Sequence, residues 1–454
     1  MKPASPVPFA QALRFWFKLG CISFGGPAGQ IAIMHRELVE RRRWISEARF
    51  LHALNYCMLL PGPEAQQLAT YLGWLMHRTW GGIVAGALFV LPSLALLVAL
   101  SAAYVLWGQL PLMAAVFWGI KPAVAAIVVH AVWRVGQRTL RDPRRAPLPW
   151  LIAVVSFVAI GFLDVPFPWV IGSAALLGAL GARAGWMGLQ GAPASHGPTR
   201  GEADASQPAQ QPALIDDDTP APEHARFSRK RLLAVVAVGL LLWGATMGAL
   251  ALHFGVNSTL AQMARFFTQA ALLTFGGAYA VLPYVVQGAV EQHQWLSAAQ
   301  MMDGLALGET TPGPLIMVVA FVGYLGGWSQ QVLGPDALLA GAALAACVST
   351  WFTFLPSFVF ILAGGPLVES TRSRLGFTAP LAAITAAVVG VIASLGLLFI
   401  THVAQRPSGG IDYAALALTA GAAWALFRNR LGVMPLIALC AVAGVVLVTS
   451  GVAG

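Results

Sequence analysis

Long apolar stretches with almost no charged residue dominate this chain of 454 residues. Residues 79–120 and 232–262 contain no Lys, Arg, Asp or Glu. A run of about 18 or more apolar residues is long enough to cross the hydrocarbon core of a bilayer as a helix. The pattern therefore predicts an all-α polytopic membrane protein surrounded by lipid.

Several of these stretches are interrupted by glycine and proline, and the interruptions occur in pairs. The breaks lie in residues 9–43 and 50–77, and again in 259–291 and 299–328. Proline has no N–H and clashes with the preceding helical turn, so each break leaves two half-helices. Each half is too short to cross alone, which predicts re-entrant elements.

The two halves of the chain repeat the same motifs in a fixed register, which indicates an internal duplication. Four motifs recur 251 positions later, and a fifth recurs 264 positions later. The pairs are Phe24-Gly25-Gly26 with Phe275-Gly276-Gly277, Trp44 with Trp295, Ser46 with Ser297, Pro61-Gly62-Pro63 with Pro312-Gly313-Pro314, and Leu91-Pro92-Ser93 with Leu355-Pro356-Ser357.

Four segments follow from this duplication. We expect an N-terminal repeat at 1–190, a disordered cytoplasmic linker at 191–230, an extra transmembrane helix at 231–258 and a C-terminal repeat at 259–454. The linker is rich in Pro, Gly, Gln and Asp and lacks an apolar run. In each repeat, about four spanning helices follow the two broken elements: 80–107, 111–136, 147–164 and 167–189, then 335–363, 378–402, 411–428 and 433–451.

Composition and charge fit a membrane protein and oppose a nucleic-acid-binding one. Hydrophobic residues make up 58% of the chain and charged residues 10%, against about 25% charged in soluble domains. The net charge of +9 comes from residues beside apolar segments, as in cytoplasmic loops, and we expect no nucleic-acid partner. We expect no metal, cofactor or enzymatic activity, since the sequence contains neither His-Glu-x-x-His nor Gly-x-Ser-x-Gly.

The distribution of arginines predicts the orientation. Arginines surround the loop at 136–147, which places it in the cytoplasm, and the loop at Asp164 then lies outside. The N-terminus and the linker also fall inside. Span 231–253 reverses the orientation of the second repeat. The loop 291–294 of that repeat, which has no Lys or Arg, therefore faces outward. The two repeats are thus expected to be antiparallel, and broken helices in an inverted duplication are typical of secondary transporters.

The breaks are the candidate binding site. Irregular backbone at membrane depth is tolerated where protein or a water-filled cavity covers it, and the half-helix N-termini favour anions. Alternatively, the glycines only allow close helix crossings and the hydroxyls only cap helix ends. The candidate substrate-binding residues at the breaks are Ser23, Gly25, Gly26, Pro27, Gln30, Pro61, Gly62, Pro63, Glu64, Gln66, Gln67, Thr274, Gly276, Gly277, Thr310, Thr311, Pro312, Gly313 and Pro314.

Four cations within or beside the predicted membrane segments have alternative roles. Lys121 lies inside the predicted span 111–136, where it either attracts an anion, snorkels, or pairs with a carboxylate from another helix. Arg14, Lys18 and Arg265 precede the breaks and are candidates for a basic entrance, with snorkelling as the alternative.

Three acidic residues do not fit a simple anion site. Glu64, Asp303 and Glu309 lie near the breaks or within the broken elements, where a carboxylate repels an anion. Glu64 alone would also stabilise the helix N-terminus that it begins. Protonation of one of the three would couple anion movement to protons.

The motifs together resemble the chromate transporter family, in its long-chain, two-domain form. The resemblance rests on Phe24-Gly25-Gly26-Pro27 with Gln30, on Arg42–Glu47, and on Pro61–Gln67, and it covers 9–190 and 259–451. It implies a bacterial inner-membrane secondary transporter that exports chromate and confers chromate resistance. The membrane potential, a proton gradient or both would drive export. Sulfate or another tetrahedral oxyanion is the alternative substrate, and a homodimer is an open alternative for the assembly.

The second repeat departs from the family pattern at two places. Ala278 replaces the proline of the first repeat, and Leu315-Ile316-Met317 replaces Glu64-Ala65-Gln66. The two repeats therefore cannot contribute equally to one site.

The orientation is testable by cysteine labelling. Residues 1–190 contain 16 basic and 6 acidic side chains, whereas residues 232–454 contain 6 of each. A cysteine replacing Arg42 should react with an impermeant reagent only from the cytoplasm, and one replacing His293 only from outside. Reaction of both from the same side would contradict antiparallel repeats.

Overall fold

The computed structural model describes residues 7–24, 26–140, 142–144, 146–183, 213–216, 219, 222–370, 378–406 and 409–451. Over these ranges the chain is helical, and its β-structure is limited to two isolated bridges. Five helices are long and apolar enough to cross a membrane: Glu64–Trp107, Pro111–Thr139, Arg229–Phe254, Pro335–Leu367 and Ala379–Ala404. The expected class, an all-helical multi-pass membrane protein, is confirmed.

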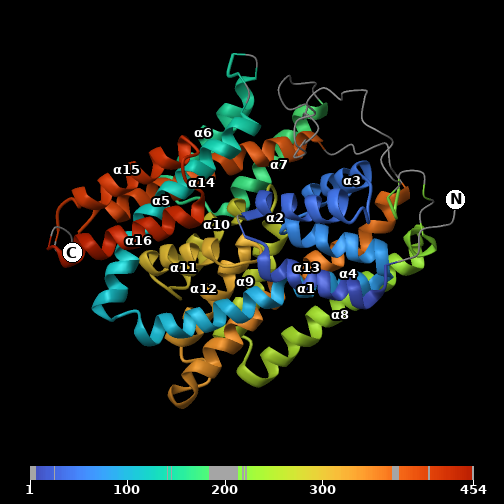
Figure 1. The fold of residues 1–454 in the computed structure, drawn as a ribbon, viewed down its shortest axis with the longest axis horizontal. Helices are drawn as coiled ribbons and strands as arrows, with labels where there is room; N and C mark the ends of the chain where they lie inside the picture. The colour runs from blue at the N-terminus through green and yellow to red at the C-terminus, as the bar shows by residue number, and fades with distance from the viewer. Residues whose placement is uncertain are drawn as a thin grey trace.

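The order of helices recurs in the two halves (Figure 1). The first half contains α1 (Phe9–Ile22), α2 (Gly26–His35) with a π-helical turn, α3 (Glu47–Leu59), α4 (Glu64–Trp107), α5 (Pro111–Thr139), α6 (Pro147–Gly161) and α7 (Phe167–Arg183). After α8 (Arg229–Phe254), the second half contains α9 (Thr259–Leu273), α10 (Ala278–Val286) with its own π-helical turn, α11 (Ala298–Thr310), α12 (Val318–Ser329), α13 (Leu338–Ser370), α14 (Thr378–Ala404), α15 (Tyr413–Phe427) and α16 (Val433–Thr449).

The helices on either side of a break fold back on each other. Phe266 of α9 stacks on Tyr284 of α10 with 4.8 Å between ring centroids, and both residues lie nine positions from Phe275. Across the next break, Gly304 of α11 lies against the ring of Phe321 in α12. The breaks at 274–277 and 311–314 are therefore the tips of antiparallel helical hairpins.

The long helix α4 consists of two helices that also form a hairpin. His77 and Arg78 have non-helical backbone angles, and Arg78 has a φ of 58°. Gly73 then lies against Gly81, and Thr70 lies against Gly86. The chain reverses at Arg78, and residues 64–76 pack antiparallel to residues 79–107.

The two halves exchange helices. Helix α5 of the first half packs against α15 and α16, while α14 of the second half packs against α6 and α7 (Figure 1). The contacts are close because they use small residues: Gly119 lies against Gly444, and Gly178 lies against Ala379 and Pro380. Each half therefore needs the other to cover its long central helix.

The outer helices are shorter than expected. Helices α6 and α15 have 15 residues each, and α16 has 17. At about 1.5 Å per residue they reach about 22–26 Å, which is less than the ~30 Å hydrocarbon core. The described part of α7 ends at Arg183, before the expected end at 189. Helix length therefore does not support about four full spans in each half.

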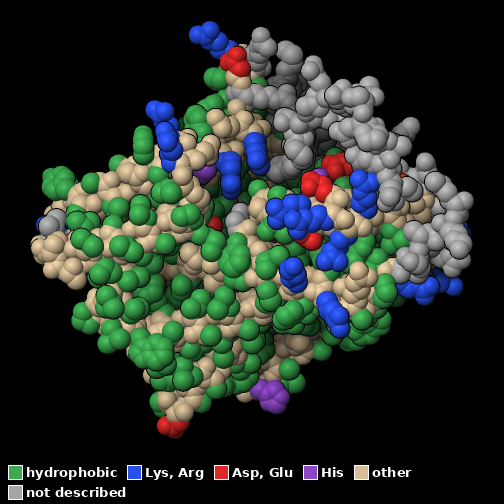
Figure 2. Space-filling view, in the orientation of Figure 1, with side chains coloured by type: hydrophobic (Ala, Val, Ile, Leu, Met, Phe, Trp, Pro, Cys, Tyr) green, Lys and Arg blue, Asp and Glu red, His purple; other side chains and the backbone are tan. Residues whose placement is uncertain are grey.

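The exposed surface is mostly apolar and its charges are unevenly placed. Figure 2 shows lysines and arginines gathered over the upper and right parts of the molecule, above a lower left face that is almost entirely hydrophobic. Helix α8 follows the lower right edge in Figure 1 and buries only Gly239, so its apolar side chains face outward. This surface fits contact with lipid.

Part of the expected linker is attached to the first half. Residues 191–212, 217, 218, 220 and 221 of that linker lie outside the described residues. We call the described residues 213–216, 219 and 222–225 the strap. The backbone of Ile215 bonds to Trp44 and Ser46, Arg49 donates to the carbonyl of Thr219, and His224 bonds to the carbonyl of Trp74. The expectation of disorder does not hold for these residues.

The strap should stabilise the folded first half. The Ile215 side chain lies in a hydrophobic recess with Leu38, Trp44 and Leu72, so Ile215→Asp should cost about 1–2 kcal/mol of stability. We expect a lower thermal midpoint in detergent, whereas deletion of 195–211 should leave the midpoint unchanged. An unchanged midpoint for Ile215→Asp would show that the strap contributes no stability.

Candidate functional site

The breaks of the two repeats are joined by two equivalent backbone hydrogen bonds. The N–H of Gly62 donates to the carbonyl of Thr274 at 2.8 Å, and the N–H of Gly313 donates to the carbonyl of Ser23 at 2.9 Å. Both pairs connect one repeat to the other, and they are related by the 251-residue register. The breaks that the sequence singles out are thus paired with each other across the two repeats.

These bonds alter the role predicted for the two glycines. Their N–H groups were expected to face an oxyanion, but in this conformation both are occupied by carbonyl oxygens of the opposite repeat. Gly62 and Gly313 have φ angles of 128° and 109°, which side chains rarely tolerate. Their observed role is therefore to form the crossed turns that join the repeats.

Two serines that were not predicted as site residues lie against these glycines. A Cβ on Gly62 would be 2.4 Å from Ser357 Oγ, and a Cβ on Gly313 would be 2.5 Å from Ser93 Cβ. Each serine belongs to a Leu-Pro-Ser motif of the opposite repeat. In the sequence this motif served only as evidence for the duplication. A hydroxyl that follows a proline inside a predicted span was also a signal for a candidate site residue.

The two serine hydroxyls are buried and have no hydrogen-bond partner among the described residues. Ser93 is 0% exposed and Ser357 is 1% exposed. An unpaired buried hydroxyl is costly, so such groups usually bind water or a ligand. A hydroxyl can donate to an oxyanion, and two of them beside crossed hairpin tips form the chemical core of the candidate site.

The first repeat adds amide side chains to this core. Gln66 and Gln67 are 0% exposed, and Gln67 Nε2 donates to the carbonyl of Pro61 at 2.7 Å. Gln30 donates to the carbonyl of Gly313, which places it beside the other tip. The carbonyl oxygens of all three amides have no partner among the described atoms. The positions equivalent to Gln66 and Gln67 are Met317 and Val318, both in the apolar core.

Most of the predicted hydroxyl donors are already occupied. Ser23 and Thr274 each donate to the carbonyl four residues earlier at 2.6 Å. Thr310 and Thr311 likewise bond to carbonyls of α11. These four hydroxyls satisfy helix ends, as the alternative interpretation stated.

The other predicted residues at the breaks shape the tips. Pro63, Pro312 and Pro314 are buried, whereas Pro27, Pro61 and Gly277 are partly exposed and Gly276 is exposed. Gly26, Gly276 and Gly277 have positive φ angles, and Gly25 lies outside the described residues.

Two of the acidic residues lie close to the tips and face arginines of α5. Oε1 of Glu64 lies 3.7 Å from the position that a Cβ on Gly277 would occupy. Glu64 also interacts electrostatically with Arg138. Glu309 accepts a hydrogen bond from Tyr279 and interacts with Arg134.

The remaining charged candidates are farther along the helices. Lys121 is close enough to Asp303 for an electrostatic interaction, but the two form no ion pair in the described part of the chain, so the three alternatives for this lysine stay open. Arg14 and Lys18 lie on the exposed face of α1, and Arg265 bonds to the carbonyl of Val256 in the α8–α9 turn. The structure does not bring these last three to the tips.

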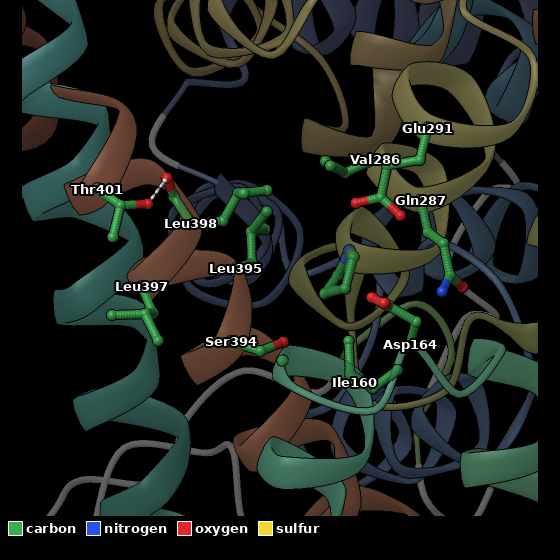
Figure 3. A pocket seen from close by; sticks show the side chains of 12 residues that line it. Ile160, Asp164, Val286, Gln287, Glu291, Ser394, Leu395, Leu397, Leu398 and Thr401 are labelled. Carbon is green, nitrogen blue, oxygen red and sulfur yellow. Dashed lines mark hydrogen bonds between the residues drawn. The ribbon is translucent and has the colours of Figure 1, made fainter. Parts of the chain in front are cut away.

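A separate cavity of about 280 Å³ lies between α6, α10 and α14. Figure 3 shows Asp164 and Glu291 on its wall, together with Gln287, Ser394 and Thr401. None of the predicted site residues lines it. Two carboxylates would repel an oxyanion, so this cavity does not fit the predicted substrate. Within the described ranges, no group of three His, Cys, Asp or Glu residues could hold a metal ion.

Comparison with known proteins identifies a family. The sequence profile of the family described as "Chromate transporter" matches residues 10–179 and 261–445. The chain is 31% identical over 448 residues to the "Chromate transport protein" of Pseudomonas aeruginosa, covering 97% of this chain and 92% of that protein. It is 28% identical over 420 residues to the "Chromate transport protein" of Cupriavidus metallidurans, covering 92% and 88%. No solved structure matches the chain significantly.

The crossed packing of glycine on serine predicts selective rescue. Gly62→Ala and Gly313→Ala should each lower the thermal midpoint, because overpacking costs about 1–3 kcal/mol and the positive φ adds strain. Ser357→Ala removes the Oγ that Gly62→Ala meets and should restore part of the loss. Ser93→Ala keeps the Cβ that the new side chain of Gly313→Ala meets, so only Ser93→Gly should restore the midpoint of Gly313→Ala.

Gly172→Ala serves as the control, because a Cβ on Gly172 would have no atom within 4 Å. Equal rescue of Gly313→Ala by both serine replacements would contradict this geometry.

Proposed function

The chain belongs to the chromate transporter family, and on that premise we propose that it exports chromate from the bacterial cytoplasm across the inner membrane as a secondary transporter. Export would confer chromate resistance. The observation that carries the proposal is the pairing of the breaks across the repeats, with a buried serine hydroxyl that has no partner among the described residues beside each pair. Membership of a transporter family favours transport over catalysis.

We propose that the two repeats are antiparallel in the membrane. The crossed hydrogen bonds at Gly62 and Gly313, and the exchange of α5 and α14, join equivalent elements of the two halves and support this proposal. Arginines around the α5–α6 loop favour its cytoplasmic location. In this orientation the N-terminus and the strap are cytoplasmic, and α8 supplies the odd crossing that inverts the second repeat.

The site would bind the oxyanion by neutral donors. The hydroxyls of Ser93 and Ser357 approach the tips from opposite repeats. Rearrangement of the crossed bonds would free the N–H groups of Gly62 and Gly313 for the same anion. Hydroxyl and backbone N–H donors recognise a tetrahedral oxyanion by its shape and charge. Sulfate is therefore the expected competitor and the second candidate substrate.

The membrane potential favours this direction of transport. A dianion that leaves a cytoplasm about 150 mV negative gains about 7 kcal/mol, at about 2.3 kcal/mol per charge per 100 mV. At 1.4 kcal/mol per decade, this energy would support a gradient of up to about 10⁵. The potential alone is therefore sufficient for detoxification.

Flux measurements on serine variants test the site. Purified protein in liposomes with an imposed potential should move radiolabelled chromate, and excess sulfate should inhibit it. A hydrogen bond to a charged group is worth about 1.5–3 kcal/mol. Ser93→Ala and Ser357→Ala should therefore each raise the KM for chromate about tenfold or more.

Ser173→Ala is the matched control, because the Ser173 hydroxyl bonds to the carbonyl of Val170 in its own helix α7. Its KM should equal that of the wild type. If Ser93→Ala and Ser357→Ala fold and also leave the KM for chromate unchanged, the site lies elsewhere.

A further inference from the structure

A buried ion pair joins the two repeats on the side where the strap lies. Nη1 of Arg49 in α3 is 3.4 Å from Oε2 of Glu369 near the end of α13, and the two side chains are 6% and 3% exposed. Tyr71 of α4 donates a hydrogen bond to Oε1 of Glu369 at 2.6 Å. We call Arg49, Tyr71 and Glu369 the ionic link. Movement of one repeat away from the other at this position would break both contacts.

Buried aromatic side chains lie between the strap and the break at 61–63. Along α4, this break is followed by Gln67, Tyr71 and Trp74, which are all buried. The rings of Tyr71 and Trp74 pack with 5.5 Å between centroids. His224 of the strap bonds to the carbonyl of Trp74, and Arg49 donates to the carbonyl of Thr219. This side of the candidate site is therefore closed in the structure.

A second polar contact joins the repeats through α4 and α11. The hydroxyl of Tyr104 donates to Oδ2 of Asp303 at 2.8 Å, and Asp303 is 3% exposed. The ring of Tyr104 packs edge-on against Phe117 and Phe321, with 5.0 and 5.3 Å between centroids. We call Tyr104 and Asp303 the hydroxyl link.

The internal duplication relates the two links to each other. In the 251-residue register, Asp303 lies one turn after the position in α11 that is equivalent to Arg49. In the 264-residue register, Tyr104 directly precedes the position in α4 that is equivalent to Glu369. The ionic link thus connects α3 to α13, and the hydroxyl link connects the equivalent helices α11 and α4.

Helix α4 shows that the links lie on opposite sides of the paired breaks. Its returning segment passes Thr70, the neighbour of Tyr71, at Gly86. Ser93, which lies against the second break, follows seven residues later, or roughly 10 Å at 1.5 Å per residue. Tyr104 follows after another eleven residues, or roughly 16 Å in the same direction. The candidate site is therefore enclosed between one link and the other.

We propose that the ionic link and the hydroxyl link are the two gates of this transporter and that they open in alternation. The inference rests on the proposed function and names the residues that control access to its site. Opening of the ionic link admits the oxyanion from the strap side, and opening of the hydroxyl link releases it on the opposite side. Both links are closed in the structure.

The chemistry of the ionic link explains how an anion would open it. Separation of a buried ion pair is costly unless water reaches the two charges. Glu369 lies two residues beyond the apolar span Pro335–Leu367, at the membrane boundary where water is available. An arriving dianion attracts Arg49 and repels Glu369, so the substrate itself favours opening of this gate.

Cysteine accessibility in the full chain tests the gates. In a background with the four native cysteines replaced by alanine, Ser357→Cys reports access to the candidate site for an impermeant thiol reagent. Arg49→Gln should raise the reaction rate at least about tenfold from the strap side only. Tyr104→Phe should raise it about as much from the opposite side only. Arg41→Gln, which breaks an exposed ion pair with Glu37 one turn away, should change neither rate.

Cross-linking keeps the inference testable if these variants do not fold. Replacement of both members of the ion pair, as in Arg49→Cys with Glu369→Cys, leaves no unpaired buried charge. A bifunctional methanethiosulfonate that joins the two cysteines should reduce radiolabelled chromate flux to background, and dithiothreitol should restore it. The same result is expected for Tyr104→Cys with Asp303→Cys. The control cross-link joins cysteines at positions 37 and 41 within one repeat, and it should leave the flux unchanged.

The outcomes separate the gates from the proposed function. Unchanged cysteine reaction rates in Arg49→Gln and Tyr104→Phe, or normal flux through either cross-linked protein, would overturn the inference. Absence of chromate flux and binding in the wild type would overturn the proposed function. The cysteine reaction rates require no substrate, so they would still decide whether the two links are gates.

Discussion

The structure depends on one constraint: peptide groups released by a helix break inside a membrane must find partners within the protein. Water is absent from the bilayer core, so irregular backbone there must be covered and hydrogen-bonded. This chain meets the requirement with donors and acceptors from the opposite repeat, through Gly62 with Thr274 and Gly313 with Ser23. The exchange of α5 and α14 then surrounds the paired tips with helices.

The same arrangement makes the two repeats interdependent at the position where a substrate would bind. Each repeat depends on the other for one backbone hydrogen bond at a break, and neither covers its own long central helix. The two hydrogen bonds between the repeats join equivalent residues, Gly62 with Thr274 and Gly313 with Ser23. A pair of interchangeable contacts is suited to a transporter that must expose one site to two sides in turn.

Sequence patterns predicted the elements well and their contacts poorly. The helical class, the duplication and the positions of the breaks follow from hydropathy, proline chemistry and a constant register. A register shows which residues are equivalent but not which ones touch, so the crossed bonds and the contact of Ser357 with Gly62 were not predictable. The attachment of the strap was missed for a similar reason: Ile215 is one apolar residue in a polar segment, and its recess exists only after folding.

The duplication is least symmetric in its charges. Helix α5 carries Lys121, Arg134 and Arg138, whereas the 264-residue register places Thr385, Leu398 and His402 at the equivalent positions of α14. Asp303 and Glu309, which lie within electrostatic range of Lys121 and Arg134, both belong to α11 of the second repeat. A symmetric set of cations would double the buried charge that must be neutralised. One cationic helix packed against one acidic helix instead brings opposite charges close to each other.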